Sequence, residues 1–280
     1  MNAMLKQILI LLTLTIIASC STDDVAIVDP STTPTDSIPT PNDSIPNPPP
    51  IAPLTPDSIL LKRLVISGAT VIGSVDTLDY VYDGLKLTKI QGDENVEFTY
   101  TDSLITQIFH SFDFSNRLDL LDYDDAGRLS GVAVYFASVF SRTIDFVYNE
   151  DNTVTYEINN VNDTTPTEWG QITLSQGRPT KLERHYWVFV YSPSGASNSY
   201  VVHEVLYYMY DYKKNPLRNV IGLDKITLLN LVNIRMYDGI YVGGPNNVVG
   251  TIAGAYTYNE YDYPLNVVRS TTYNKQYFYE

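Results

Sequence analysis

The stretch that decides the fold is residues 123–130, which read Y-D-D-A-G-R-L-S. An Asp directly after the tyrosine can accept backbone hydrogen bonds across a short loop, and a glycine can adopt the left-handed conformation that closes the loop. A tyrosine at the strand end lays its ring on the sheet and keeps its hydroxyl in water. The segment therefore predicts a β-hairpin turn made by Tyr123, Asp124, Gly127 and Arg128.

The same arrangement recurs along the chain. In each copy a short run ends in Tyr, a polar residue usually follows, and a return run ends in apolar residues. Several runs alternate apolar and polar residues, as residues 96–100 do, and this period of two is typical of β-strands. Six good copies indicate a repeat. Their tyrosines are Tyr82, Tyr100, Tyr123, Tyr148, Tyr210 and Tyr258, and residues 177–182 form a degenerate copy.

The spacing of these runs predicts a mostly β fold, an antiparallel meander of hairpins in a curved or partly rolled sheet. We expect at most one short helix, over residues 223–237, where apolar residues recur every three or four positions. Residues 239–250 are expected to form a glycine-rich loop. No Gly-Lys-Ser/Thr follows, so this loop does not fit a phosphate-binding loop.

The N-terminal residues have the features of a secretion signal. Lys6 supplies a positive charge, and residues 9–18 form an apolar run of about ten residues, too short to span a bilayer as a helix. This pattern predicts a removable signal over residues 1–19. Residues 17–20, I-A-S-C, resemble a bacterial lipobox. The resemblance implies that Cys20 is lipidated, becomes the first mature residue and tethers the chain to a membrane.

Residues 20–57 are expected to form a disordered stalk. Ten of the 16 prolines lie between Pro30 and Pro56, and the rest is mainly Thr, Ser, Asp and Asn, so little apolar area can be buried. Asp23 and Asp24 resemble the surface-export signal of Bacteroidota lipoproteins, which implies display on the outer-membrane surface. The alternative is an anchor that faces the periplasm. Residues 58–280 are then a single β-rich domain.

Residues 123–130 also resemble the YD (Rhs-type) repeat, in which Tyr-Asp is followed after two residues by Gly-Arg, an apolar residue and Thr or Ser. The other copies lack Gly-Arg. Together with the stalk and the closing Tyr277, Phe278 and Tyr279, the pattern is similar to Bacteroidota surface lipoproteins that carry domains of unknown function. The resemblance covers most of residues 60–280 and implies no catalytic residue.

Composition excludes several classes of function. The formal net charge is −14, with 18 Lys and Arg against 32 Asp and Glu, which argues against a nucleic-acid partner. A single Cys excludes a disulfide framework and Cys-rich metal sites, and three scattered His exclude a dense His cluster. We therefore predict no metal site and no cofactor.

The residue patterns also favour no catalytic site. Nucleophilic hydrolysis is not favoured, because the chain has no G-x-S-x-G motif. His185 and His203 lie on the two arms of a long hairpin and could approach each other. Carboxylates that glycoside hydrolysis or calcium binding would need occur in two acidic clusters, residues 122–125 and 150–152. Both lie at expected turns, so turn chemistry explains them more simply.

Carbohydrate binding suits the composition best, because sugar rings stack on exposed aromatic rings. The chain has 23 Tyr. The first strand of the long hairpin is apolar on both faces, which fits either a strand buried on both sides or one with a binding face. The alternative is that these rings are core and cross-strand packing. The candidate ligand-binding residues are Trp169, Tyr186, Trp187, Tyr191 and Tyr208.

The sequence thus predicts an outer-membrane-anchored lipoprotein that acts as a non-catalytic binding module for glycan or protein. The alternative is a structural or accessory lipoprotein that scaffolds an envelope complex. A hydrolase acting on carbohydrate is the third hypothesis.

Overall fold

The computed structural model describes residues 59–68, 75–93, 95–111, 116–191, 197–232, 244–249, 254–270 and 273–280. The chain divides into two compact units, Met1–Ile51 and Ala52–Glu280, and all described residues belong to the second. The signal segment, Cys20 and the stalk lie outside the described residues.

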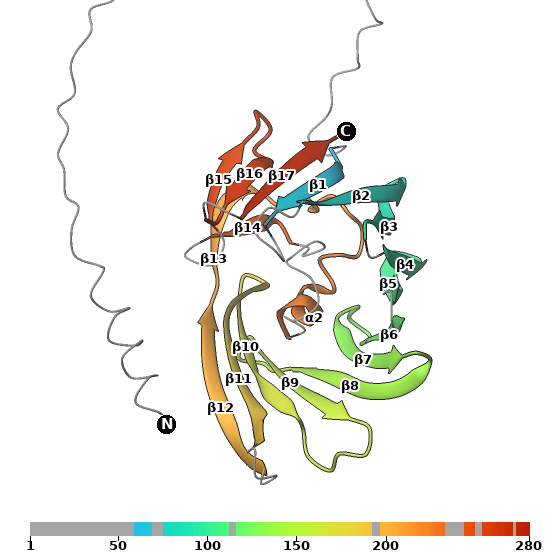
Figure 1. The fold of residues 1–280 in the computed structure, drawn as a ribbon, viewed down its shortest axis with the longest axis vertical. Helices are drawn as coiled ribbons and strands as arrows, with labels where there is room; N and C mark the ends of the chain where they lie inside the picture. The colour runs from blue at the N-terminus through green and yellow to red at the C-terminus, as the bar shows by residue number, and fades with distance from the viewer. Residues whose placement is uncertain are drawn as a thin grey trace, which may run out of the picture. The chain divides into compact units, whose positions relative to one another are not determined.

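Fifteen of the described strands form one antiparallel sheet (Figure 1). From β1 to β12 the strands follow one another in chain order, and β17, β16 and β15 continue the sheet beyond β1, so that β15 and β12 are its two edges. The predicted meander of hairpins is therefore confirmed. The strands are β1 (Leu61–Ser67), β2 (Val75–Asp83), β3 (Lys86–Gln91), β4 (Asn95–Thr101), β5 (Leu104–Ser111), β6 (Arg117–Tyr123), β7 (Leu129–Phe136), β8 (Val139–Tyr148), β9 (Thr153–Asn160), β10 (Glu168–Ser175), β11 (Arg178–Tyr191), β12 (Ser197–Tyr207), β15 (Ala255–Tyr258), β16 (Pro264–Val268) and β17 (Asn274–Tyr279).

A separate two-stranded ribbon pairs β13 (Met209–Lys214) with β14 (Asn246–Val249). Two expectations change here. The copy that begins at Tyr210 is not a hairpin, because β13 pairs with β14, and residues 217–232 between them contribute to the core. The glycine-rich stretch at 239–250 is not all loop, because β14 occupies part of it.

The one helix among the described residues is α2 (Thr227–Val232), preceded by turns. It lies within the span 223–237 in which one short helix was predicted, and residues 233–237 lie outside the described part. Figure 1 shows the sheet curving around the segment that carries α2. Leu223, Ile226 and Leu229 of this segment are at most 1% exposed and belong to the same hydrophobic cluster as the strands. The segment thus fills the inner face of the sheet.

The repeat has a structural basis in strand register. In two of the copies the repeat tyrosine lies opposite the first apolar residue of its return strand: Tyr82 pairs with Leu87 and Tyr123 with Leu129. Both leucines are fully buried. In both hairpins a register shift immediately precedes the tyrosine. The bulge bends the strand end and directs the ring over the neighbouring hairpin.

The hydroxyls of two repeat tyrosines bind backbone carbonyls of the adjacent strand. Tyr82 donates to the carbonyl oxygen of Leu61 at 2.8 Å, and Tyr123 donates to that of Ile105 at 2.7 Å. Burial raises the pKa of both phenols well above the ordinary value. At these two copies the tyrosine therefore joins its strand to the preceding one by a side-chain hydrogen bond as well as by strand pairing.

The turn after Tyr123 is held by Asp124. Its carboxylate accepts the backbone N–H of Ala126 at 3.0 Å and of Arg128 at 2.8 Å, and it also accepts a hydrogen bond from Arg128 Nε at 2.7 Å. Gly127 has φ +69°. The guanidinium of Arg128 lies 4.2 Å from the ring centroid of Tyr148 in the next hairpin.

A charged cluster is buried between β5 and β6. Arg117 and Asp119 are at most 1% exposed and form a two-point ion pair, with Nε–Oδ1 at 2.5 Å and Nη2–Oδ2 at 2.7 Å. His110 is also 1% exposed, and its Nε2 lies 3.7 Å from Oδ2 of Asp119. Burial lowers the pKa of His110, and Asp119 partly opposes the shift. His110 is thus favoured in its neutral form.

Within the described residues, no helix has the length and apolar character needed to cross a membrane.

Candidate binding face on the outer side of β10 to β12

The predicted aromatic residues divide between the two faces of the sheet. Leu182 in β11 is fully buried, so the even-numbered residues of β11 lie on the inner side of the sheet and the odd-numbered ones on the outer side. Trp187 lies on the outer side, and Trp169 of β10 lies there too, because it pairs with His185. Tyr186 lies on the inner side, under the guanidinium of Arg184 at 5.3 Å.

Of the other two predicted residues, Tyr208 is not on this face, and the structure does not test Tyr191. Tyr208 lies between β12 and β13 and packs against the hydrophobic core; burial raises the pKa of its phenol to about 12. Tyr191 is the last residue of β11, and its side chain lies outside the described part of the structure. The candidate surface therefore rests on the two tryptophans.

Three aromatic rings form a stack across the outer face, here called the ladder: Trp169 of β10, His185 of β11 and His203 of β12. These residues are direct cross-strand partners. The Trp169 and His185 centroids are 5.5 Å apart with planes at 11°, and the two imidazoles are 4.5 Å apart at 9°. The two histidines do meet, as their positions on the two arms allowed. They meet ring on ring, which stabilises the sheet surface.

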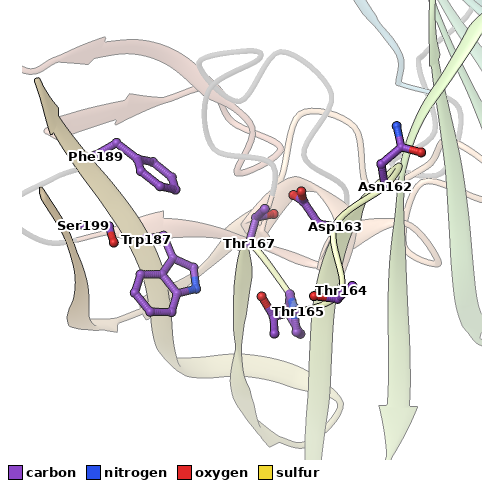
Figure 2. A pocket seen from close by; sticks show the side chains of 9 residues that line it. Asn162, Asp163, Thr164, Thr165, Thr167, Trp187, Phe189 and Ser199 are labelled. Atoms are coloured by element: carbon purple, nitrogen blue, oxygen red, sulfur yellow. The ribbon is translucent and has the colours of Figure 1, made fainter. Parts of the chain in front are cut away.

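Beside the ladder, Trp187 and Phe189 form an exposed pair, here called the platform. Trp187 is 37% exposed and Phe189 is 59% exposed. The outer side of β11 is thus not covered by other described residues. Figure 2 shows the two rings on one strand, with Ser199 on the neighbouring strand and Thr164, Thr165 and Thr167 on a loop that faces them.

The platform and this loop border an open hollow of about 340 Å³. The loop, residues 161–167, joins β9 to β10. It is fixed by backbone hydrogen bonds: Val161 N–H donates to Ser141 O at 2.7 Å, and Thr167 N–H donates to Ile158 O at 2.8 Å. Trp187 N–H also donates to Thr167 O at 3.3 Å. The loop and the platform therefore keep a fixed relation to each other.

The polar side of the hollow is nearly uncharged. Its lining carries three threonine hydroxyls, the Ser199 hydroxyl and the Asn162 amide, and Asp163 is its one charged side chain among the described residues. Asp163 Oδ2 accepts a hydrogen bond from Asn160 Nδ2 at 3.1 Å. The site thus combines flat aromatic rings with several hydroxyl and amide groups, which suits a ligand with both apolar faces and many hydroxyls.

The predicted set omitted Phe189 and the threonine-rich loop. The alternation of β11 carries the signal for Phe189, because Trp187 and Phe189 share a face in any strand. The approach of the loop depends on the pairing of β9 with β10 and of β10 with β11, which the local pattern does not fix.

One carboxylate of each acidic cluster is bound within its own turn. The carboxylate of Asp124 is bound by its own loop, as described above. Asp151 likewise accepts the backbone N–H of Thr153 at 3.1 Å and its hydroxyl at 2.6 Å. In the residues that the structure describes, no three His, Cys, Asp or Glu side chains are grouped so that they could hold a metal ion.

Comparison with known proteins adds a likeness to solved structures. No protein-family model matches the chain, and no curated protein matches its sequence. Among solved structures, the chain is similar to a porin-like protein from Bacteroides uniformis at 15% sequence identity, with a TM-score of 0.43. The match covers 81% of this chain and 99% of that one.

Proposed function

We propose that the chain is a non-catalytic, membrane-tethered binding module that holds glycan in the hollow at Trp187 and Phe189. The observation that carries the proposal is the exposed platform beside a fixed loop of hydroxyl-bearing residues. Aromatic residues that only fill a core are covered, whereas Trp187 and Phe189 are 37% and 59% exposed. The C–H faces of a pyranose ring match such a surface, and its hydroxyls match the threonines and Asp163.

Glycan binding by the full chain and by two variants tests this proposal. Trp187→Ala and Phe189→Ala should each weaken binding to the glycans that the unaltered protein retains on an array by roughly tenfold or more, because buried aromatic anchors dominate such interfaces. Tyr212→Ala is the matched control, since Tyr212 is a fully exposed aromatic residue that does not line the hollow. Equal binding by all three variants, or no retained glycan, would contradict the proposal.

The tether is proposed from the sequence. Cys20→Ala should move the protein out of the membrane fraction, because the lipid would have no sulfur to attach to. Surface display is tested separately by protease treatment of intact cells, which should remove the body of a displayed protein and spare one that faces the periplasm. Retention of Cys20→Ala in the membrane fraction would contradict the lipid anchor.

A second candidate function is an accessory role in an envelope complex, and the β12 edge favours it. β12 has 11 residues and is an edge of the large sheet, and Tyr200 and Tyr207 on it are 52% and 70% exposed. A long apolar edge can accept a partner strand. Tyr207→Lys should then release the protein from cross-linked envelope complexes without changing glycan binding. Unchanged cross-linking would count against this role.

A further inference from the structure

A second cavity lies at the opposite end of the hairpins from the Trp187 hollow, where the tyrosine-tipped turns meet the segment that carries α2. Its volume is about 460 Å³. Side chains from three turns and from the helix segment line it, among them Arg128 after β6, Arg178 after β10 and Lys225 before α2. Three cationic side chains therefore border one cavity in a chain whose net charge is −14.

Two of these cations have acidic partners. Arg128 is paired with Asp124, with Nη2–Oδ2 at 2.6 Å, and its guanidinium is supported from the other side by the Tyr148 ring. Lys225 Nζ lies 3.4 Å from Oδ2 of Asp224. Both pairs are substantially exposed, so they are screened and weak.

Arg178 is different, because its partners in the described residues are uncharged. Its Nη1 donates to Asn246 Oδ1 at 2.7 Å, its Nη2 donates to Gln176 Oε1 at 3.2 Å, and its guanidinium lies 5.4 Å from the Tyr210 ring centroid. Two amides and a ring hold the guanidinium in place without neutralising it. A planar guanidinium fixed in this way is the group best suited to bind an oxyanion at two points.

Another part of the cavity lining is apolar. Leu174 of β10, Leu228 and Leu231 of α2, and Val248 of β14 contribute to it. The rest of the lining is mainly polar and includes Asn149, Asn152, Gln176 and one acid, Asp224. The cavity thus offers cationic and apolar side chains together, and its size falls in the range of ordinary small-ligand sites.

We propose that this cavity is a second binding site, which takes a small amphiphilic oxyanion: a carboxylate or phosphoryl group held by Arg178, with an apolar body against the leucines. Arg128 and Lys225 add positive potential at the rim. The proposal is independent of glycan binding, because it uses other residues and another part of the sheet.

Equilibrium dialysis of the full chain in a zwitterionic detergent tests the site, with 2-naphthoate as the carboxylate probe, 2-naphthyl phosphate as the phosphoryl probe and uncharged 2-naphthamide as the control. We expect at least one anion to bind roughly tenfold or more tightly than the amide, because a hydrogen-bonded charge pair is worth that much. Comparing the two anions shows which group the site prefers. If 2-naphthamide binds as tightly as the anions, the site is merely apolar and the proposal is overturned. The proposal is also overturned if neither anion binds.

Substitution locates the binding. Arg178→Gln should weaken binding of the preferred anion roughly tenfold to a hundredfold and leave that of the amide unchanged, and Arg178→Lys should retain part of the affinity. Arg218→Gln is the matched control, because Arg218 is an exposed arginine that does not line the cavity. Thermal unfolding of each variant shows whether it is folded. Anion binding that survives in folded Arg178→Gln would overturn the assignment.

Discussion

Asp124 and Asn259 occupy the same place in two turns that are far apart in the chain. Each side chain accepts the backbone N–H groups two and four residues later: Asp124 from Ala126 and Arg128, and Asn259 from Tyr261 and Tyr263. In both loops the first residue's N–H also donates to the carbonyl of the fifth residue, and the fourth residue's N–H donates back to the carbonyl of the first. One five-residue turn is therefore used twice, with Asp in one copy and Asn in the other.

The fourth residue of this turn must adopt a left-handed conformation, and this gives the first prediction. Gly127 has φ +69° and Asp262, its equivalent, has φ +68°. A Cβ at Gly127 would meet no atom within 4 Å, so only the backbone conformation restricts the residue. Gly127→Val should lower the free energy of unfolding by about 1–2 kcal/mol, because a β-branched residue resists positive φ.

Gly127→Asn is the control at the same position, since Asn tolerates the left-handed region. In urea denaturation, Gly127→Asn should lower the free energy of unfolding by less than half as much as Gly127→Val. Equal midpoints for the Val variant and the unaltered protein would show that the turn does not depend on glycine.

Gly170 in β10 is restricted for a different reason, the close approach of the next strand. A Cβ there would lie 2.0 Å from the carbonyl oxygen of Glu183 and 3.0 Å from the Cα of Arg184. Gly170→Ala should therefore force β10 and β11 apart and destabilise the fold by more than about 2 kcal/mol. Gly131→Ala is the matched control, because the nearest atoms at that strand glycine are 3.9 Å away. Similar melting temperatures for both variants would contradict the packing described between these strands.

The hydroxyl of Tyr123 joins two hairpins, and its removal gives the third prediction. Tyr123→Phe keeps the ring and loses the hydrogen bond to Ile105 O, which should cost about 1 kcal/mol of unfolding free energy. Tyr212→Phe, at a fully exposed tyrosine, should change nothing measurable. Chemical denaturation distinguishes the two, and an unaffected Tyr123→Phe would show that the hydroxyl contributes no net stability.

The buried cluster of His110, Arg117 and Asp119 predicts a pH dependence of stability. Burial lowers the pKa of His110, so the unfolded chain, with a His pKa near 6.5, binds the proton more readily than the folded chain does. The free energy of unfolding should then be at its full value above about pH 6.5 and fall as the pH decreases below it. His110→Gln should lose less stability than the unaltered protein between pH 7 and pH 5. Parallel curves for the two proteins would exclude His110 as the titrating group.

The fold could be predicted from the sequence because each hairpin is specified by residues that are close together in the chain. The Tyr-to-apolar spacing of each hairpin appears in the register, where Tyr82 faces Leu87 and Tyr123 faces Leu129. The copy at Tyr210 shows the limit of such a pattern. Its sequence resembles the others, but β13 pairs with β14 instead of folding back, and this pairing depends on residues that are distant in the chain.

The candidate site depends equally on non-local geometry. Trp169 and Trp187 could be proposed from residue type, but their shared outer face follows from the pairing of β10 with β11. The loop that completes the hollow reaches the platform only because β9 and β10 place it there. Tyr186 and Tyr208, chosen for the same aromatic character, are turned inward or packed on the core.

The pairing of β1 with β17 has a consequence for the order of assembly. β1 lies between β2, its immediate successor, and β17, which is synthesised some two hundred residues later. Hairpins from β2 to β12 can form as soon as each is made, because their partners are close in sequence. One edge of β1 (Leu61–Ser67), in contrast, has no partner until β17 (Asn274–Tyr279) has been synthesised. We therefore expect the pairing of β1 with β17 to form late in folding, as a long-range step that joins strands already paired with their neighbours in sequence.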